Sequence, residues 1–294
     1  MRNQSAPSRA IPDGPPADPT KPGVVTPEEA RALLERSREL RFAFPSSFGN
    51  PGLEGEAPDR AELVEAVQVL PAEQADELAA NTWRLWMTEP RDVEGGRSFL
   101  EGRMGSLVLY GAGLLALRDG DVAESRRLNE QALVLANNPQ AEALAHLGLS
   151  RVALEEGNPE EALRHALEAR EAAEPLDEEL GRVTFHLQAH SLRATGDLDR
   201  AAELFEESLA LNRRVGDSGM VEVERYNLGF VNLRRGDTRA AERYLSDAAD
   251  DPLAAAALAY VQGDRDRARA LLDKVEGDLP VEDRAELEWL RSRV

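Results

Sequence analysis

The sequence has 294 residues, with 55 acidic side chains against 35 basic ones and a formal net charge of −20. A surface this acidic repels phosphate backbones and anionic lipids, so the composition argues against direct binding of nucleic acid or membrane. It contains no cysteine, which excludes a disulfide framework and a thiolate zinc site. The acidic surface either keeps the protein in solution or forms a groove for a basic peptide.

Residues 1–25 are rich in Pro, Ser, Gly and Asp and poor in apolar side chains, which predicts a disordered tail. This segment lacks the apolar core that is typical of a signal peptide. No apolar run in the sequence approaches membrane-spanning length. A cytoplasmic location is therefore expected.

A helix is predicted to begin after Thr26, because Thr caps helices well, Pro27 suits the first helical position and Glu29 completes a capping box. The phenylalanine-rich stretch FAFPSSFGNPGLEGEAP follows at 42–58. We expect residues 26–58 to form an N-terminal helix and a loop that covers the end of a helical array. The alternative is that this loop occupies a groove or contacts a partner.

From residue 59 to 294 the sequence favours helices almost without interruption, and a glycine followed by Asp or Asn recurs every 27 to 40 residues. Glycine tolerates the left-handed conformation that ends a helix, and Asp or Asn caps the next one. A small side chain stands five residues after each glycine, where two helices must approach closely. This pattern predicts repeated helical hairpins. The glycines are Gly120, Gly157, Gly196, Gly236 and Gly263, and the small residues are Ser125, Ala162, Ala201, Ala241 and Ala268.

The pattern resembles the tetratricopeptide repeat, whose signature combines a Leu-Gly pair in the first helix, Gly-Asp at the turn and spaced alanines in the second helix. Leu228 and Gly229, followed by Gly236, Asp237 and Ala241, carry the resemblance most clearly. It covers about residues 105–275 and implies an all-α fold, a right-handed superhelical solenoid. The last segment, 280–294, is predicted to be an amphipathic capping helix in which Trp289 and Leu290 cover the end of the array.

A more degenerate unit at 75–102 places Trp83 and Trp86 on one helix, before Gly96 and Phe99. It resembles the first repeats in the helical C-terminal regions of bacterial ATP-binding regulators of the LuxR and antibiotic-regulator types. The sequence contains no Walker-type phosphate loop, so the resemblance implies a helical sensor or scaffold without their ATPase or DNA-binding activities.

The tetratricopeptide resemblance implies which residues face the concave side, because the first helix of each hairpin lines it. Aromatic side chains interleaved with Arg and His suit a peptide that carries apolar groups and a carboxylate. The alternative is that a tightly wound superhelix packs these side chains into a core. The candidate groove residues are Tyr110, Leu114, Arg118, Leu147, Arg151, His186, His190, Arg193, Tyr226, Phe230 and Arg234.

Little in the sequence points to catalysis. His186 and His190 lie four residues apart, but the glutamate of the H-E-x-x-H zinc motif is missing between them, so neither a metal nor another cofactor is predicted. We therefore expect a non-enzymatic protein- or peptide-binding scaffold or adaptor, regulatory in role. A small-ligand sensor is the second hypothesis, and a metal-dependent enzyme built on the two histidines is the third.

Overall fold

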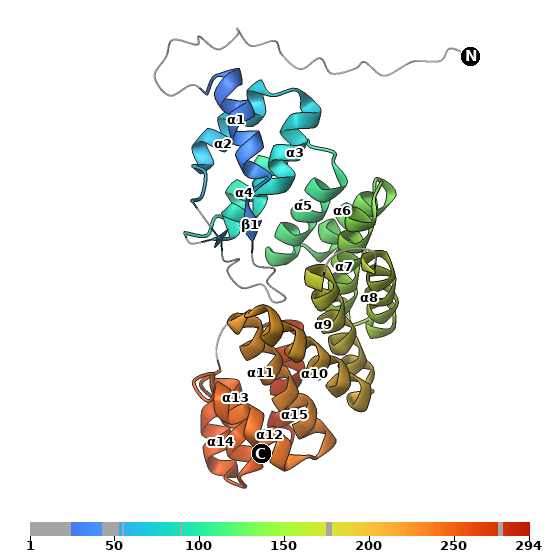
Figure 1. The fold of residues 1–294 in the computed structure, drawn as a ribbon. Coiled ribbons are helices and arrows are strands. Elements are labelled where there is room, and N and C mark those ends of the chain that lie inside the picture. The colour runs from blue at the N-terminus through green and yellow to red at the C-terminus, as the bar shows by residue number, and fades with distance from the viewer. Residues whose placement is uncertain (1–24, 43–52, 55, 89, 175–177, 276–278) are drawn as a thin grey trace, which may run out of the picture.

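Helices follow one another along the chain with short turns between them, and together they form an arc (Figure 1). The computed structural model describes residues 25–42, 53–54, 56–88, 90–174, 178–275 and 279–294. The predicted disordered tail, apart from Val25, and most of the phenylalanine-rich loop lie outside the described residues.

Five helical hairpins make up most of the arc and confirm the predicted solenoid. Each first helix contacts the first helix of a neighbouring hairpin, as α5 does with α7, α7 with α9 and α11 with α13. In Figure 1, α6 and α8 lie on the outer side of the arc. The pairs are α5 (Ser106–Arg118) with α6 (Val122–Val134), α7 (Pro139–Glu155) with α8 (Pro159–Ala173), α9 (Glu178–Thr195) with α10 (Leu198–Val215), α11 (Ser218–Arg235) with α12 (Thr238–Leu245), and α13 (Pro252–Val261) with α14 (Arg265–Leu272).

The turns of the hairpins have the predicted chemistry. All five turn glycines adopt a left-handed conformation, with φ between 73° and 90°. The Asp or Asn that follows each glycine accepts a hydrogen bond from a backbone N–H three residues later, as Asp237 does from Ala240 at 3.0 Å. Each turn thus ends one helix and starts the next within two residues.

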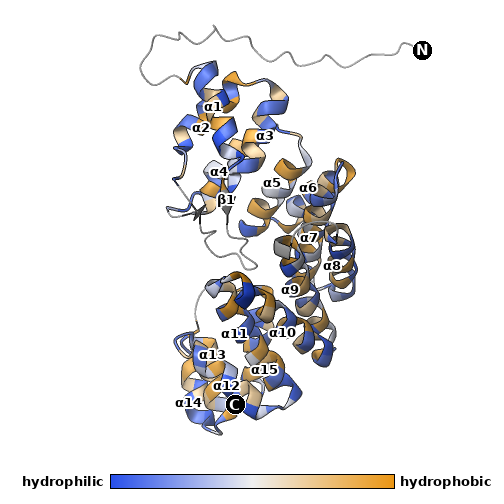
Figure 2. Ribbon diagram, viewed as in Figure 1, coloured by the Kyte–Doolittle hydropathy of each residue, from blue (hydrophilic) through white to orange (hydrophobic). Residues whose placement is uncertain are grey.

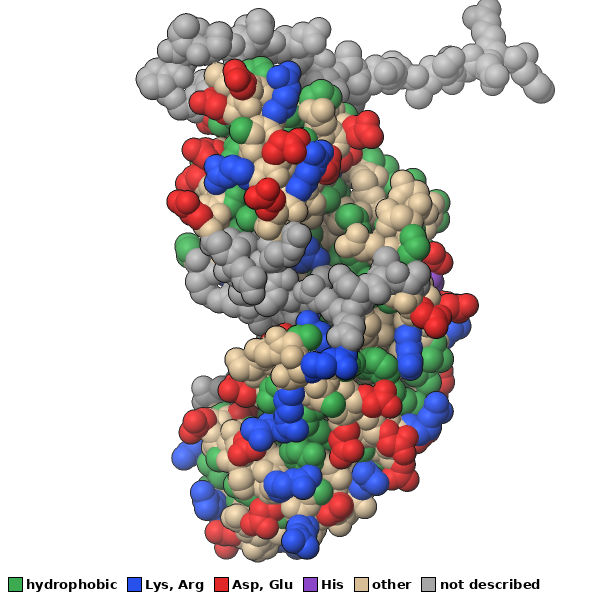
Figure 3. Space-filling model, in the orientation of Figure 1, with side chains coloured by type: hydrophobic (Ala, Val, Ile, Leu, Met, Phe, Trp, Pro, Cys, Tyr) green, Lys and Arg blue, Asp and Glu red, His purple; other side chains and the backbone are tan. Residues whose placement is uncertain are grey.

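The small residue after each turn is fully buried: Ser125, Ala162, Ala201, Ala241 and Ala268 all have 0 % of their surface exposed. These positions are therefore packing positions, as predicted. Figure 2 shows many helices orange on one side and blue on the other, which is the amphipathic pattern of helices that bury one face. Figure 3 shows acidic and basic side chains interspersed over the visible face.

The N-terminal part consists of α1 (Pro27–Ser37), β1 (Arg41–Phe42), β2 (Leu53–Glu54), α2 (Arg60–Val69), α3 (Ala72–Thr82), the 3-10 helix η1 (Trp83–Met87) and α4 (Val93–Leu100). The capping box of Thr26 and Glu29 is present as predicted. The two short strands pair antiparallel, with Arg41 opposite Glu54. Trp83 and Trp86 lie on η1, and Trp86 stacks on Phe99 with ring centroids 4.1 Å apart.

The short 3-10 helix η2 (Ser246–Ala248) contacts α11, α12 and α13. The last helix, α15 (Val281–Arg291), has two packing environments. Its C-terminal half covers the end of the array: Leu290 is fully buried in a hydrophobic cluster to which α11, α12, α13 and α14 contribute, and Trp289 contacts Tyr260. Its first residue, Val281, instead packs against Ala153 and Leu154 of α7. α15 therefore bridges the inner side of the arc between its middle and its C-terminal end.

Candidate functional site

A cavity of about 640 Å³ opens on the inner side of the arc, between α7, α9, α11 and the start of α15. We call it the inner cavity. Four of the predicted groove residues line it: Arg151, His186, His190 and Tyr226. The other lining residues are Leu117, Leu154, Glu155, Leu187, Glu222, Val223, Arg225, Asn227, Asp247, Ala248, Asp250, Asp251, Pro280, Val281, Glu282 and Asp283.

The remaining predicted residues lie outside this lining. Leu147 and Phe230 are packed into the hydrophobic core, with 1 % and 0 % of their surface exposed. Tyr110 is buried edge-on against Trp83. Leu114 and Arg118 are half-buried, and burial lowers the pKa of Arg118 to about 10. The inner side of the arc is thus partly core and partly cavity.

The two histidines on α9 are buried and hold different partners. The Nδ1 atom of His186 lies 3.0 Å from a carboxylate oxygen of Glu224, which is itself fully buried. The same oxygen accepts a hydrogen bond from the Ser208 hydroxyl at 2.5 Å. Glu224 thereby fixes the His186 ring at the cavity wall.

His190 lies beside His186, with ring centroids 4.4 Å apart. Its Nδ1 atom faces the guanidinium of Arg193 at 3.2 Å. Burial lowers the pKa of His190 well below its usual range, and the positive charge of its neighbours acts in the same direction. The ring is therefore neutral at pH 7 and accepts the hydrogen bond from Arg193.

Two of the four arginines that the sequence offered to a ligand carboxylate, Arg193 and Arg234, form ion pairs with α15. Glu286, 1 % exposed, lies 3.3 Å from Arg234 and 4.0 Å from Arg193. Arg193 is itself only 6 % exposed. This buried carboxylate lies within ion-pair distance of both guanidiniums, so the terminal helix supplies an acidic group of the kind predicted for a ligand.

Tyr226 and Asp283 meet at the cavity wall, where the tyrosine hydroxyl donates a hydrogen bond to the carboxylate at 2.9 Å. Burial raises the pKa of Asp283 to about 6, although the hydrogen bond from Tyr226 and the charge of Arg193 oppose the rise. Burial also raises the pKa of the Tyr226 hydroxyl, which is neutral at pH 7. The charge of Asp283 therefore changes close to neutral pH, at about pH 6.

The lining of the inner cavity is acidic on balance. Seven carboxylates, those of Glu155, Glu222, Asp247, Asp250, Asp251, Glu282 and Asp283, stand against the two guanidiniums of Arg151 and Arg225. One of the two, Arg225, is paired with Asp247 at 3.2 Å. The apolar part of the wall comes from leucine, valine and proline side chains. Such a lining suits an apolar ligand that carries positive charge.

Sequence reasoning missed the contributions of α15 and of the segment from Asp247 to Asp251. The spacing of Glu282 and Glu286, four residues apart on one helix face, was the available signal for α15. It indicated an acidic helix face but not the surface against which that face lies.

Among the helices of the described ranges, none is long and apolar enough to cross a membrane. No curated protein matches the sequence. The sequence profile of the tetratricopeptide repeat matches residues 143–168, 183–207 and 253–274, which correspond to three of the five hairpins.

Several solved structures are similar in fold at low sequence identity. A signal-transduction ATPase with a tetratricopeptide repeat sensor, from Pyrococcus horikoshii, is 14 % identical over 90 % of this chain and 40 % of its own, with a TM-score of 0.61. A Rap protein complexed with competence and sporulation factor is 15 % identical over 90 % of this chain and 78 % of its own, with a TM-score of 0.57.

A third similar structure is that of PilF from Pseudomonas aeruginosa, 16 % identical over 76 % of this chain and 99 % of its own, with a TM-score of 0.53. Identities this low show similarity of fold only. The same type of helical repeat is indicated by the turn geometry, the buried small residues, the matched segments and these structures. The chain contains a tetratricopeptide-repeat-like helical region.

Proposed function

We propose that this protein is a non-enzymatic, regulatory binding module that holds a short basic peptide segment in the inner cavity. The observation that carries the proposal is the cavity itself, which combines an apolar wall with seven carboxylates and two guanidiniums. Solenoids of helical hairpins present such inner surfaces to partners. The Rap protein of similar fold was solved in complex with competence and sporulation factor, which supports a ligand on this kind of scaffold.

The charge of the proposed ligand is opposite to that inferred from the candidate groove residues, and it agrees with the basic peptide that the acidic composition left open. The inference from the groove residues rested on arginines such as Arg193 and Arg234, and Glu286 now pairs with both. A lysine or arginine side chain of the ligand would instead lie near Asp250, Asp251 and Asp283, while its apolar neighbours contact Val223 and Leu187. Burial of apolar surface supplies affinity and the carboxylates supply selectivity.

A substitution that fills the cavity without changing charge tests this proposal. Val223→Trp on α11 places an indole in the cavity, and Val134→Trp, at a position on α6 that is 83 % exposed, is the matched control. Peptides are selected from a random display library against the wild-type chain, and the enriched sequences are synthesised for calorimetry. We expect enrichment of Lys and Arg beside apolar residues, and binding to the wild type and Val134→Trp but not to Val223→Trp.

Equal binding of the enriched peptides to both tryptophan variants would place the ligand elsewhere and overturn the proposal. So would a selection dominated by acidic peptides. Circular dichroism of each variant verifies that the helices are retained.

A small cationic molecule with an apolar body is the second candidate ligand, because about 640 Å³ lies within the range of small-molecule sites. A thermal-shift screen of metabolites against the wild type and Val223→Trp separates the two candidates. Stabilisation of the wild type alone by an amine, together with a peptide selection that yields no binder, would favour the small ligand.

A further inference from the structure

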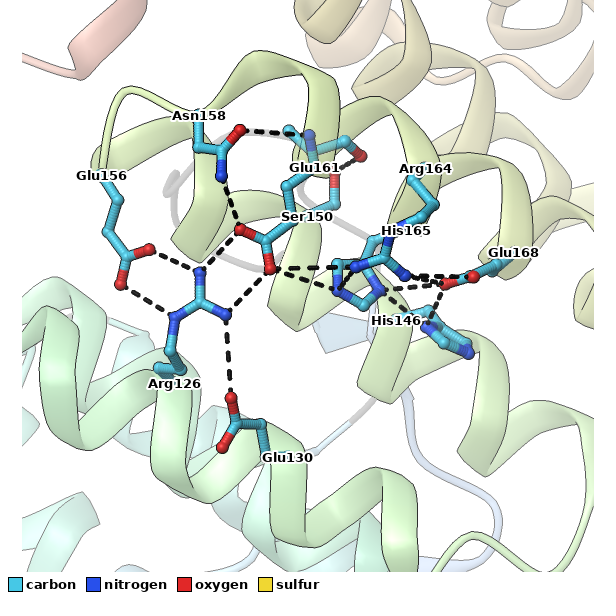
Figure 4. Close-up of polar contacts among 11 residues, drawn as sticks. Arg126, Glu130, His146, Ser150, Glu156, Asn158, Glu161, Arg164, His165 and Glu168 are labelled. Carbon is cyan, nitrogen blue, oxygen red and sulfur yellow. Dashed lines mark hydrogen bonds and ion pairs between the residues drawn. The ribbon is translucent and has the colours of Figure 1, made fainter.

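A second polar cluster lies on the α7–α8 hairpin, and none of its three central residues lines the inner cavity. His146 comes from α7, and His165 and Glu168 come from successive turns of α8. Figure 4 shows the two imidazoles and the carboxylate pointing toward one another. The histidines are 9 % and 6 % exposed, and the Glu168 side chain is 39 % exposed, so the cluster is reached from solvent on one side.

Three potential ligand atoms converge in this cluster. The Nδ1 atoms of His146 and His165 lie 3.0 Å apart, and one oxygen of Glu168 lies 3.3 Å and 3.1 Å from them. Four ligands placed tetrahedrally around a zinc ion at roughly 2.0 Å are separated from one another by roughly 3.3 Å. The three atoms therefore already have nearly the spacing of one face of such a tetrahedron.

With a carboxylate at Glu168, the protons of the two rings cannot satisfy all three contacts. If one imidazole donates its Nδ1 proton, the lone pair of the other Nδ1 still faces the Glu168 oxygen. If both donate to Glu168, two N–H groups oppose each other across 3.0 Å. A cation just off the plane of the triangle would be attracted to all three atoms at once.

We propose that His146, His165 and Glu168 bind one zinc ion between α7 and α8. Two imidazole nitrogens and a carboxylate oxygen form a common zinc ligand set, and water would fill the fourth position. The ion would link the two helices of one hairpin.

The surroundings of the cluster support the ligand roles. Glu161 lies 3.8 Å from the outer nitrogen of His165, and a small approach would let it accept a hydrogen bond from that N–H group when Nδ1 is the ligand. Arg126 holds Glu161 in turn, at 3.1 Å.

Arg164 competes with the metal, because its guanidinium lies 3.1 Å from Glu168 and 3.1 Å from the outer nitrogen of His165. Its side chain is 54 % exposed, so it can rotate into solvent when a metal ion binds. The competition predicts binding of moderate strength, which a chelator reverses.

The test uses the full chain without a histidine tag, stripped of metal by a chelator and titrated with zinc chloride in a calorimeter. We expect one zinc ion per chain. Glu168→Gln and His165→Ala should each weaken binding by about tenfold or more. The matched control is Glu171→Gln, an exposed acid one turn further along α8. Cobalt in place of zinc should give the strong visible absorption of a tetrahedral site.

Glu168→Gln does not change the size of this partly exposed side chain, so the variant is expected to fold. It therefore remains informative even if His165→Ala does not fold. Absence of stoichiometric zinc binding in the wild type would overturn the proposal. Equal affinity of wild type, Glu168→Gln and Glu171→Gln would do the same, because it would assign binding to the acidic surface in general.

Discussion

At the scale of single residues, Asp283 combines a partly buried carboxyl group with a pKa of about 6, against an ordinary value of 3.8. The pKa in the folded state is raised, so the folded protein holds this proton more tightly than the unfolded chain does. The free energy of unfolding therefore falls as the pH rises from about 4 to about 6, and the full cost of the buried charge remains above that range.

Asp283→Asn should accordingly stabilise the protein at about pH 8 by on the order of 2 kcal/mol, with the gain vanishing near pH 4. The amide oxygen still accepts the hydrogen bond from Tyr226. Urea unfolding at several pH values measures the effect, and Asp266→Asn, at a side chain that is 98 % exposed, is the control. A difference between Asp283→Asn and wild type that does not change with pH would contradict the argument.

Gly148 on α7 and Gly113 on α5 lie on either side of the buried Asn129 of α6. A methyl group at Gly148 would overlap the carbonyl end of that side chain, whose amide donates to the Ser125 carbonyl at 2.8 Å. The two glycines thus allow a polar side chain to sit where two hairpins meet.

Gly148→Ala should lower the free energy of unfolding by about 1–3 kcal/mol through this overlap. Asn129→Ala removes the obstructing atoms, so the double variant should lose less than the sum of the two single variants. Chemical denaturation of the wild type, the two single variants and the double variant gives the coupling free energy between positions 148 and 129. If the two losses of unfolding free energy simply add, Asn129 moves aside at no cost.

At the scale of elements, Glu286 is a buried carboxylate of α15 that lies beside two arginines of the repeats. Removal of Glu286 leaves Arg193 buried without the charge of this partner, and breaking a buried ion pair on one side is strongly destabilising. Glu286→Ala should therefore cost about 3 kcal/mol of unfolding free energy. Glu288→Ala, at an exposed position on the same helix, should cost little. Equal loss in both variants would mean that the ion pairs contribute nothing specific.

The hairpins could be predicted because their rules are local. A glycine such as Gly236 and the cap that follows it, Asp237, define a turn within a few residues, and small residues such as Ala241 show where helices touch. The equivalent turn at Gly216 escaped notice because it joins two hairpins and falls outside the repeat spacing. The 3-10 geometry at Trp83 was also missed, since a short apolar stretch does not distinguish it from an α-helix.

The candidate site was less predictable because it depends on the path of the whole chain. The tetratricopeptide resemblance placed Arg151, His186, His190 and Tyr226 on the inner side, and all four line the cavity. The resemblance left open whether the inner side is groove or core, and it could not show that Leu147 and Phe230 would be covered by neighbouring helices. Nor could it show that the acids of α15 would meet residues more than fifty positions earlier in the sequence.

At the scale of the whole molecule, the net charge of −20 should accelerate the approach of a cationic ligand. Raising the salt concentration from about 20 mM to about 500 mM should slow the association of a lysine-containing peptide by about tenfold, because the field is screened. Stopped-flow fluorescence measures the rate, and a neutral peptide of equal length is the control. The same slowing for both peptides would rule out electrostatic attraction.

The contact between Arg284 of α15 and Glu155 of α7, 2.9 Å long, joins positions 129 residues apart. An open array of repeats unfolds from its ends, since each unit is stabilised only by its neighbours. The helices α8 to α14 lie between the two residues of this contact, so the C-terminal hairpins cannot unfold one by one unless α15 detaches first. Hydrogen exchange in this segment should therefore follow a single opening event, with α8 to α14 protected to the same degree. The helices α1 to α5 lie outside this segment, so their protection against exchange should increase step by step from the N-terminal end.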